Sequence, residues 1–260
     1  MKYALLFLMS VCCLPALPAI DRYAPGDTLY AWAQSGLALR REASLKAAKL
    51  TGIPYGAALL VLNEKSGKGL NNVEVEAVPG FSGNGSLSPA VTLRGMFARV
   101  VFRGDTGWVF DGYLSRLPAM RYTADKNTGK PVFENFDEYA TRNFGILGDE
   151  KHGTFEYAGP ESTTKKIFGN GIMVDTRVSK SGESRMILPD LSMEEAFLIF
   201  NYMNHYEWDI RHPSTNPSDD TWVLMPQSDH EWNFGKMVCG HRILYLEYER
   251  MVIITSECSC

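Results

Sequence analysis

The sequence predicts a mainly β protein, in which a small N-terminal β-barrel precedes an α+β domain with an antiparallel sheet and one or two covering helices. Residues 99–114 predict the barrel most directly. There an apolar run, a Gly-Asp turn and a second short apolar run around Trp108 are typical of a β-hairpin. Short strand patterns separated by turn residues lie upstream, as in a small barrel or sandwich. Downstream, strand patterns flank a capped apolar helix, which favours an α+β domain.

The composition is that of an ordinary globular protein without basic character. Of 260 residues, 45% are apolar and 22% are charged, and the formal net charge is -4. Proteins that bind nucleic acid usually carry a basic surface, so we expect no nucleic-acid partner. The length suffices for two small domains, each with its own core, and the patterns place them at residues 20–118 and 132–260.

The N-terminus has the layout of an export signal. Lys2 is followed by an apolar run to Leu14 and by a short helix-breaking segment that ends at Ala19. We therefore predict a signal peptide over residues 1–19 and a periplasmic or extracellular location. The apolar run is shorter than the roughly 20 residues that cross a membrane, so we expect no transmembrane span.

Two cysteines in this segment offer an alternative. A lipid attached to Cys12 or Cys13 would anchor the mature chain at the envelope. Lipoprotein signals usually place a small residue before the modified cysteine. Val11 is not small, so simple cleavage after Ala19 is the favoured interpretation.

Within residues 20–118, short strands alternate with turns. Extended segments, where apolar residues alternate or cluster, are predicted at 30–33, 37–42, 57–62 and 73–77. Residues 43–50 fit either a short helix or a turn-rich connector, because eight residues without a strong apolar face make a weak helix. The Gly- and Ser-rich residues 81–95 are predicted to interrupt the strands.

Four blocks in this region resemble, in order, a bacterial SH3-like domain of exported cell-envelope proteins. The blocks are Leu37-Ala38-Leu39-Arg40, Ile53-Pro54-Tyr55-Gly56, Phe97-Ala98-Arg99-Val100, and Gly107-Trp108-Val109 with Gly112-Tyr113-Leu114. The chain departs from the family pattern at Glu42-Ala43 and in longer loops at 63–72 and 81–95. These departures fall at the ends of the barrel, so the resemblance still implies an SH3-like barrel.

The resemblance also implies an aromatic groove that binds a peptide or a glycan stem, so the expected partner is peptidoglycan or a peptide or protein ligand. Candidate groove residues in or beside the matching blocks are Arg40, Tyr55, Trp108, Asp111 and Tyr113. Large aromatic side chains of small barrels usually belong to the core, so the favoured role of Trp108 and Tyr113 is to seal the barrel.

The C-terminal half combines strands with two helices. Residues 119–131 are polar and loop-rich, as expected of a linker. A helix is predicted over 133–144, and a second helix begins at the capping box Ser192–Glu195. Strands are predicted at 154–158, on both sides of Gly169-Asn170-Gly171, and at 185–188, 222–225, 242–248 and 251–255, with a turn at Glu249-Arg250.

Three cysteines remain after removal of the signal: Cys239, Cys258 and Cys260. In an oxidising compartment they can form one disulfide and leave one thiol. Because Cys258 and Cys260 are so close in sequence, we expect Cys239 to pair with one of them.

Cell-wall peptidases often carry SH3-like domains, so Cys239 and His241 suggest a peptidase or amidase. Two residues close in sequence do not by themselves converge in space, and a disulfide would consume the thiol. The sequence also has no phosphate-binding loop and no serine nucleophile elbow. We therefore expect no enzyme, no catalytic residue and no cofactor.

Histidines and carboxylates between residues 205 and 231 suggest a metal site. They are His205, His212, Asp219, Asp220, Asp229, His230 and Glu231. The spacing between His205 and His212 is wider than that of the usual zinc-binding histidine pair. We therefore interpret this region as solvated loop and expect no metal.

These observations predict an exported, non-catalytic binding protein that contacts cell-wall material or a peptide. The first alternative is a structural or inhibitory protein that acts through protein–protein contact. The second alternative is a hydrolase that uses Cys239.

Overall fold

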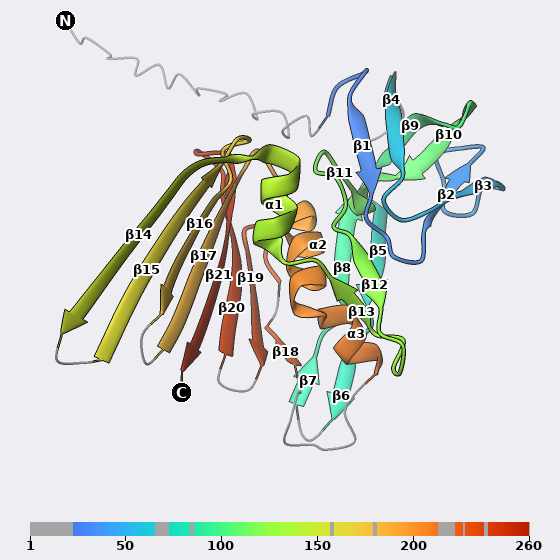
Figure 1. Cartoon of the computed structure of the whole chain (residues 1–260). Coiled ribbons are helices and arrows are strands. Elements are labelled where there is room, and N and C mark those ends of the chain that lie inside the picture. Colours follow the sequence, from blue (N-terminus) through green and yellow to red (C-terminus); the bar gives the residue numbers. More distant parts are fainter. Residues whose placement is uncertain are drawn as a thin grey trace, which may run out of the picture.

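The computed structural model describes residues 23–65, 73–83, 86–156, 159–178, 181–212, 222–225, 227–236 and 239–259. The predicted signal peptide at 1–19, with Cys12 and Cys13, lies outside the described residues, as do Asp219, Asp220 and Cys260. The described chain is mainly β, as predicted. Its antiparallel strands form a seven-stranded sheet, an eight-stranded sheet and several small hairpins, with few helices (Figure 1).

The first sheet is built from the N-terminal half of the chain. Its strands are β1 (Thr28–Ala31), β2 (Leu37–Arg40), β3 (Lys49–Ile53), β4 (Ala58–Lys65), β9 (Phe97–Phe102), β10 (Asp105–Phe110) and β11 (Leu114–Ser115). They lie in the order β11-β1-β4-β9-β10-β2-β3, and the two end strands are not paired with each other in the described chain. The sheet is therefore open in its hydrogen bonding, although the barrel prediction requires its ends to approach.

The β9–β10 hairpin confirms the hairpin predicted around Trp108, which lies opposite Arg99. Its turn comes earlier than the sequence suggests, because Arg103 and Gly104 have φ angles of 53° and 90° and β10 begins at Asp105. Gly107 allows β2 to approach β10, since a Cβ atom at this position would lie 2.7 Å from the carbonyl oxygen of Arg40.

Two small hairpins are inserted between β4 and β9. In them β5 (Val73–Val78) pairs with β8 (Val91–Gly95), and β6 (Phe81–Gly83) pairs with β7 (Ser86–Ser88). The prediction that residues 81–95 only interrupt the strands is therefore wrong. Backbone hydrogen bonds between paired strands do not depend on apolar side chains, so a Gly- and Ser-rich segment can still form a hairpin.

The second sheet contains the C-terminal half of the chain. Its strands are β14 (Ile146–Glu156), β15 (Gly159–Phe168), β16 (Met173–Val178), β17 (Ser181–Pro189), β18 (Trp222–Leu224), β19 (Glu231–Lys236), β20 (Cys239–Leu246) and β21 (Met251–Ser259), in the order β14-β15-β16-β17-β21-β20-β19-β18. The predicted turns at 169–171 and at 249–250 are confirmed. The strand predicted at 154–158 begins earlier, at Ile146, because a polar edge strand lacks the apolar alternation that marks its start.

The helices are α1 (Phe136–Phe144), α2 (Met193–Asn204), α3 (Tyr206–Arg211) and the 3-10 helix η1 (Asp111–Tyr113). The predicted capping box is confirmed at α2, where the Glu195 amide donates to Ser192 Oγ at 3.2 Å and the Ser192 amide donates to Glu195 Oε2 at 3.1 Å. Every residue of α2 from Met193 to Tyr202 is buried. A helix that is buried on all sides must be enclosed. Helix α2 contacts β20 and β21 of the second sheet and also η1, and Figure 1 shows α2 between the second sheet and the N-terminal strands.

Trp32 joins the two halves of the chain in one hydrophobic cluster. It is fully buried, stacks on Tyr202 with ring centroids 5.7 Å apart, and meets Tyr139 edge to face at 6.4 Å. Its indole nitrogen donates to the Leu117 carbonyl at 2.9 Å, and the Tyr202 hydroxyl donates to the carbonyl of Trp32 itself. The sequence predicts only a short extended segment here.

Residues 119–131, predicted as a linker, hold β12 (Tyr122–Ala124) and the first residue of β13 (Pro131–Phe133). These two strands pair as a hairpin. Met120 is buried, and its carbonyl accepts a hydrogen bond of 2.9 Å from the hydroxyl of Tyr55. This segment therefore packs against the first sheet.

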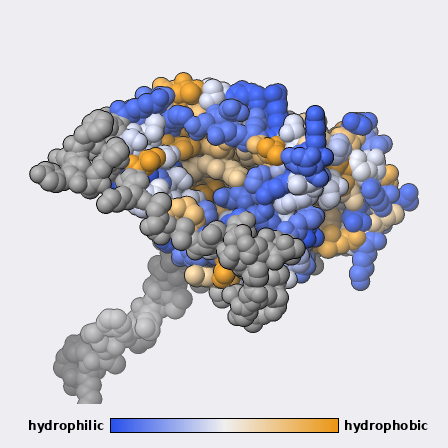
Figure 2. All heavy atoms as spheres, turned by 60° about the horizontal axis from the view of Figure 1, so that its bottom comes forward, coloured by the Kyte–Doolittle hydropathy of each residue, from blue (hydrophilic) through white to orange (hydrophobic). Residues whose placement is uncertain are grey.

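The large apolar side chains that are exposed at the surface belong to different elements. Tyr248 and Leu147 are 97% and 74% exposed, in the β20–β21 turn and in β14. Figure 2 shows a face on which hydrophilic residues predominate and apolar residues gather in a hollow near the middle. Single exposed apolar residues are normal in soluble proteins and do not mark a binding site by themselves.

Candidate functional site

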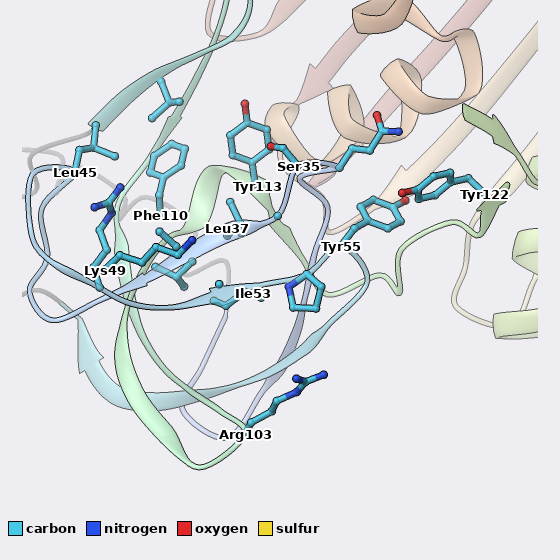
Figure 3. Close-up of a pocket in the computed structure, with 18 residues that line it drawn as sticks. Ser35, Leu37, Leu45, Lys49, Ile53, Tyr55, Arg103, Phe110, Tyr113 and Tyr122 are labelled. Atoms are coloured by element: carbon cyan, nitrogen blue, oxygen red, sulfur yellow. The ribbon is translucent and has the colours of Figure 1, made fainter. Parts of the chain in front are cut away.

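A groove of about 930 Å³ lies on the first sheet, along the β2–β3 hairpin (Figure 3). Strands β2 and β3 contribute Leu37 and Ile53 to it, and the turn after β3 contributes Pro54 and Tyr55. The 3-10 helix η1 contributes Tyr113. The other lining residues are Gln34, Ser35, Gly36, Ala38, Arg40, Leu45, Lys49, Gly52, Val75, Arg103, Val109, Phe110 and Tyr122.

The β2–β3 connection decides the shape of one side of this groove. Between the two strands, residues 41–48 form turns and bends, so the connector interpretation of this segment is right and the helix interpretation is wrong. The guanidinium of Arg40 donates to the Ala47 carbonyl at 2.8 Å and holds the connection against its own strand. Leu45 extends from this connection and is 45% exposed.

Tyrosines form the opposite end of the groove. Tyr55 and Tyr122 meet edge to face with ring centroids 5.4 Å apart, and Figure 3 shows them side by side. Burial raises the pKa of Tyr113 to about 12, and burial also raises the pKa of Tyr55. Both hydroxyls are therefore protonated at neutral pH and can donate hydrogen bonds. The hydroxyl of Tyr55 already donates to Met120, within the protein.

Three of the five predicted groove residues line this groove: Arg40, Tyr55 and Tyr113. Trp108 is half-buried on β10 and is not among the lining residues. The side chain of its neighbour Val109 lines the groove and lies on the opposite face of the strand, since side chains alternate along a strand.

Asp111 also lies outside the groove lining, because its side chain is turned into the protein. Only 3% of the residue is exposed. Its carboxylate accepts hydrogen bonds from the Tyr23 hydroxyl at 2.7 Å and from the Met96 amide at 2.6 Å. A buried carboxylate held in this way ties η1 to Met96, between β8 and β9, and to Tyr23 ahead of β1. The sequence offers no signal that separates this role from ligand binding.

Several groove residues carry no signal in the sequence that marks them for this site. Leu45 and Lys49 lie in residues 43–50, for which the sequence allows either a short helix or a connector. Arg103 lies in the turn between β9 and β10. Tyr122 lies in the predicted linker, where a single tyrosine gives no signal of its own. Only the fold brings Leu45, Lys49, Arg103 and Tyr122 to the same groove.

Cys239 forms a disulfide with Cys258, which lies opposite it on the neighbouring strand, with Cα atoms 4.1 Å apart. This bond decides between the two partners that the sequence left open. In the bonded state Cys239 has no thiolate to act as a nucleophile. His241 Nδ1 lies 2.8 Å from the Ser256 hydroxyl, and burial lowers the pKa of this histidine.

The histidines and carboxylates between residues 205 and 231 do not converge on one site where the structure describes them. His212 stacks on Trp208, and Asp229 pairs with Arg94. His230 stacks on Tyr245. Among the described residues, no three histidine, cysteine or acidic side chains form a group that could hold a metal ion.

No helix within the described ranges is both long and apolar enough to cross a membrane. The chain matches no protein-family model, and no curated protein or solved structure is significantly similar to it.

Proposed function

We propose that this chain is an exported, non-catalytic binding protein whose groove along β2–β3 holds an extended peptide, including the peptide part of cell-wall material. In this proposal the first sheet is an SH3-like barrel and the second sheet, with its helices, is an α+β domain. The groove is the observation that carries the proposal. It combines an apolar floor with tyrosines and an exposed proline, which is the surface that extended, proline-rich peptides recognise.

The strand order of the first sheet supports the barrel part of the proposal. Strands β1, β4, β9 and β10 are consecutive neighbours, and β11 returns to pair with β1 after the short η1 turn. This meander agrees with the four sequence blocks that resemble an SH3-like domain. Two of those blocks, which begin at Leu37 and at Ile53, supply residues on opposite strands of the groove.

Sedimentation with insoluble peptidoglycan tests the proposal. The mature protein is mixed with purified peptidoglycan and centrifuged, and its depletion from the supernatant is measured. We expect depletion of the wild type, and we expect Tyr122→Ala to bind at least about fivefold more weakly, because tyrosine is among the residues whose truncation at an interface costs about 1 kcal/mol or more. Tyr122 is 39% exposed, so its removal should leave the fold intact.

A matched variant controls for loss of a surface tyrosine. Tyr248 is 97% exposed in the β20–β21 turn and does not line the groove, so Tyr248→Ala should bind like the wild type. No depletion of the wild type would reject peptidoglycan as the partner and would favour the protein–protein alternative. Equal weakening by both variants would show that the groove is not the binding site.

A further inference from the structure

The charge of the β2–β3 hairpin is opposite in sign to that of the whole chain. Residues 37–53 contain the cations Arg40, Arg41, Lys46 and Lys49 and a single carboxylate, Glu42. The whole chain has a formal net charge of -4. The hairpin that forms the groove therefore carries a local excess of positive charge.

The groove itself repeats this asymmetry. Its lining includes Arg40, Lys49 and Arg103, and none of the lining residues is aspartate or glutamate. Figure 3 shows Lys49 and Arg103 on different sides of the strand pair that carries Ile53. Both residues are exposed, and neither makes a salt bridge within the described part of the chain. The guanidinium of Arg103 lies over the Phe102 ring, 5.1 Å from its centroid. This contact neutralises no charge, so both cations can still pair with a ligand of opposite sign.

The apolar part of the groove limits the form of such a ligand. Figure 3 shows Leu37 and Ile53 between Lys49 and the tyrosines, and Pro54 also lines the groove. The centre of the groove therefore offers apolar contact and little to a highly hydrated polyanion. The hydroxyl of Tyr113 remains protonated at neutral pH and can donate a hydrogen bond to a peptide carbonyl. A peptide backbone that carries carboxylates satisfies both parts of the surface.

We infer that the groove selects acidic, extended peptide segments, with ligand carboxylates near Lys49 and Arg103 and the ligand backbone over Leu37, Ile53 and the tyrosines. This inference rests on the proposed function, because it names the charge class of the peptide that occupies the same groove. It predicts that affinity depends on ligand charge and falls as salt concentration rises.

Three fluorescent dodecapeptides of identical length test the inference, with alternating Pro-Glu, Pro-Gln and Pro-Lys sequences. Proline keeps all three extended, so only the charge differs. Fluorescence anisotropy with the mature protein should show binding of the Pro-Glu peptide about tenfold tighter than that of the Pro-Gln peptide at low salt, with the Pro-Lys peptide weakest. The difference should shrink when salt is raised.

Charge reversal within the groove should invert this order. In the Lys49→Glu/Arg103→Glu variant we expect the Pro-Glu peptide to bind about tenfold more weakly than to the wild type, and the Pro-Lys peptide to bind more tightly. The matched control is Arg41→Glu/Lys46→Glu, which changes the net charge equally. Arg41 and Lys46 are exposed on the same connection and do not line the groove, so this variant should largely keep the wild-type order.

Several results would overturn the inference. They are equal binding of the three peptides, preference for Pro-Lys, or equal effects of the two double variants. Competition by inorganic polyphosphate as effective as that by the Pro-Glu peptide would indicate a general polyanion site instead of a peptide site. If the protein sediments with peptidoglycan but binds none of the three peptides, the inferred charge preference is wrong while the proposed function stands. Binding of Pro-Glu without binding of peptidoglycan would instead reject only the cell-wall partner.

Discussion

Replacement of Cys258 by serine removes the disulfide to Cys239 and should lower the free energy of unfolding by about 3 kcal/mol. The two cysteines are 19 residues apart in sequence. Closing a loop of this length lowers the conformational entropy of the unfolded chain by about 11 cal/mol/K, which corresponds to about 3 kcal/mol at 25 °C. Residues 239 and 258 are also in register on β20 and β21, so the bond joins strands that are already paired.

Urea unfolding under non-reducing conditions, followed by tryptophan fluorescence, measures this loss. The matched control is Cys260→Ser, because Cys260 is the remaining cysteine of the mature chain and should carry the free thiol. Titration of the denatured, unreduced protein should find one thiol in the mature wild type, none in Cys260→Ser and two in Cys258→Ser. The thiol count also tests whether Cys239 could act as a nucleophile, since a hydrolase would need this thiol to be free.

Two results would refute the reasoning. If Cys260→Ser loses the stability and Cys258→Ser does not, the pairing is wrong. If Cys258→Ser loses less than about 1 kcal/mol while its thiol count rises as expected, the pairing is right but the loop-entropy estimate does not hold. A wild type with three free thiols would reopen the hydrolase alternative.

Three further predictions concern the fold, each measured by urea unfolding. Trp32→Phe should lower the free energy of unfolding by about 2–3 kcal/mol, because it removes packing and leaves the buried Leu117 carbonyl without its indole donor; an unchanged midpoint would contradict the central role of this residue. Gly107→Ala should lower the free energy of unfolding by about 2 kcal/mol, because the new Cβ would lie 2.7 Å from the Arg40 carbonyl oxygen. A variant as stable as the wild type or more stable would show that β2 can move away from β10 at little cost. Burial lowers the pKa of His241 below 6.5, so the unfolded chain binds this proton more readily. The resulting stability is complete above about pH 6.5 and decreases as pH falls. Between about pH 7.5 and pH 5.5, His241→Gln should lose less stability than the wild type, and equal losses would refute this.

The sequence predicted the features that depend on neighbouring residues. Three such features could be predicted from the sequence: the β9–β10 hairpin, the turn at 169–171 and the capping box at Ser192. Turn residues and helix caps act over only a few positions of the chain. The mainly β class followed from many such local signals together. Strand limits were less accurate where alternation was weak, as in β14 and in residues 81–95.

The sequence by itself also determined which cysteines were available and that 37–53 is a basic segment. Only the tertiary structure decided that Cys239 pairs with Cys258, that Asp111 is buried, and that Tyr122 and Arg103 share a groove with Arg40. These facts depend on strand register and on the packing of residues far apart in the chain. A local pattern states which side chains a segment carries, but contacts between distant segments arise only when the whole chain is folded.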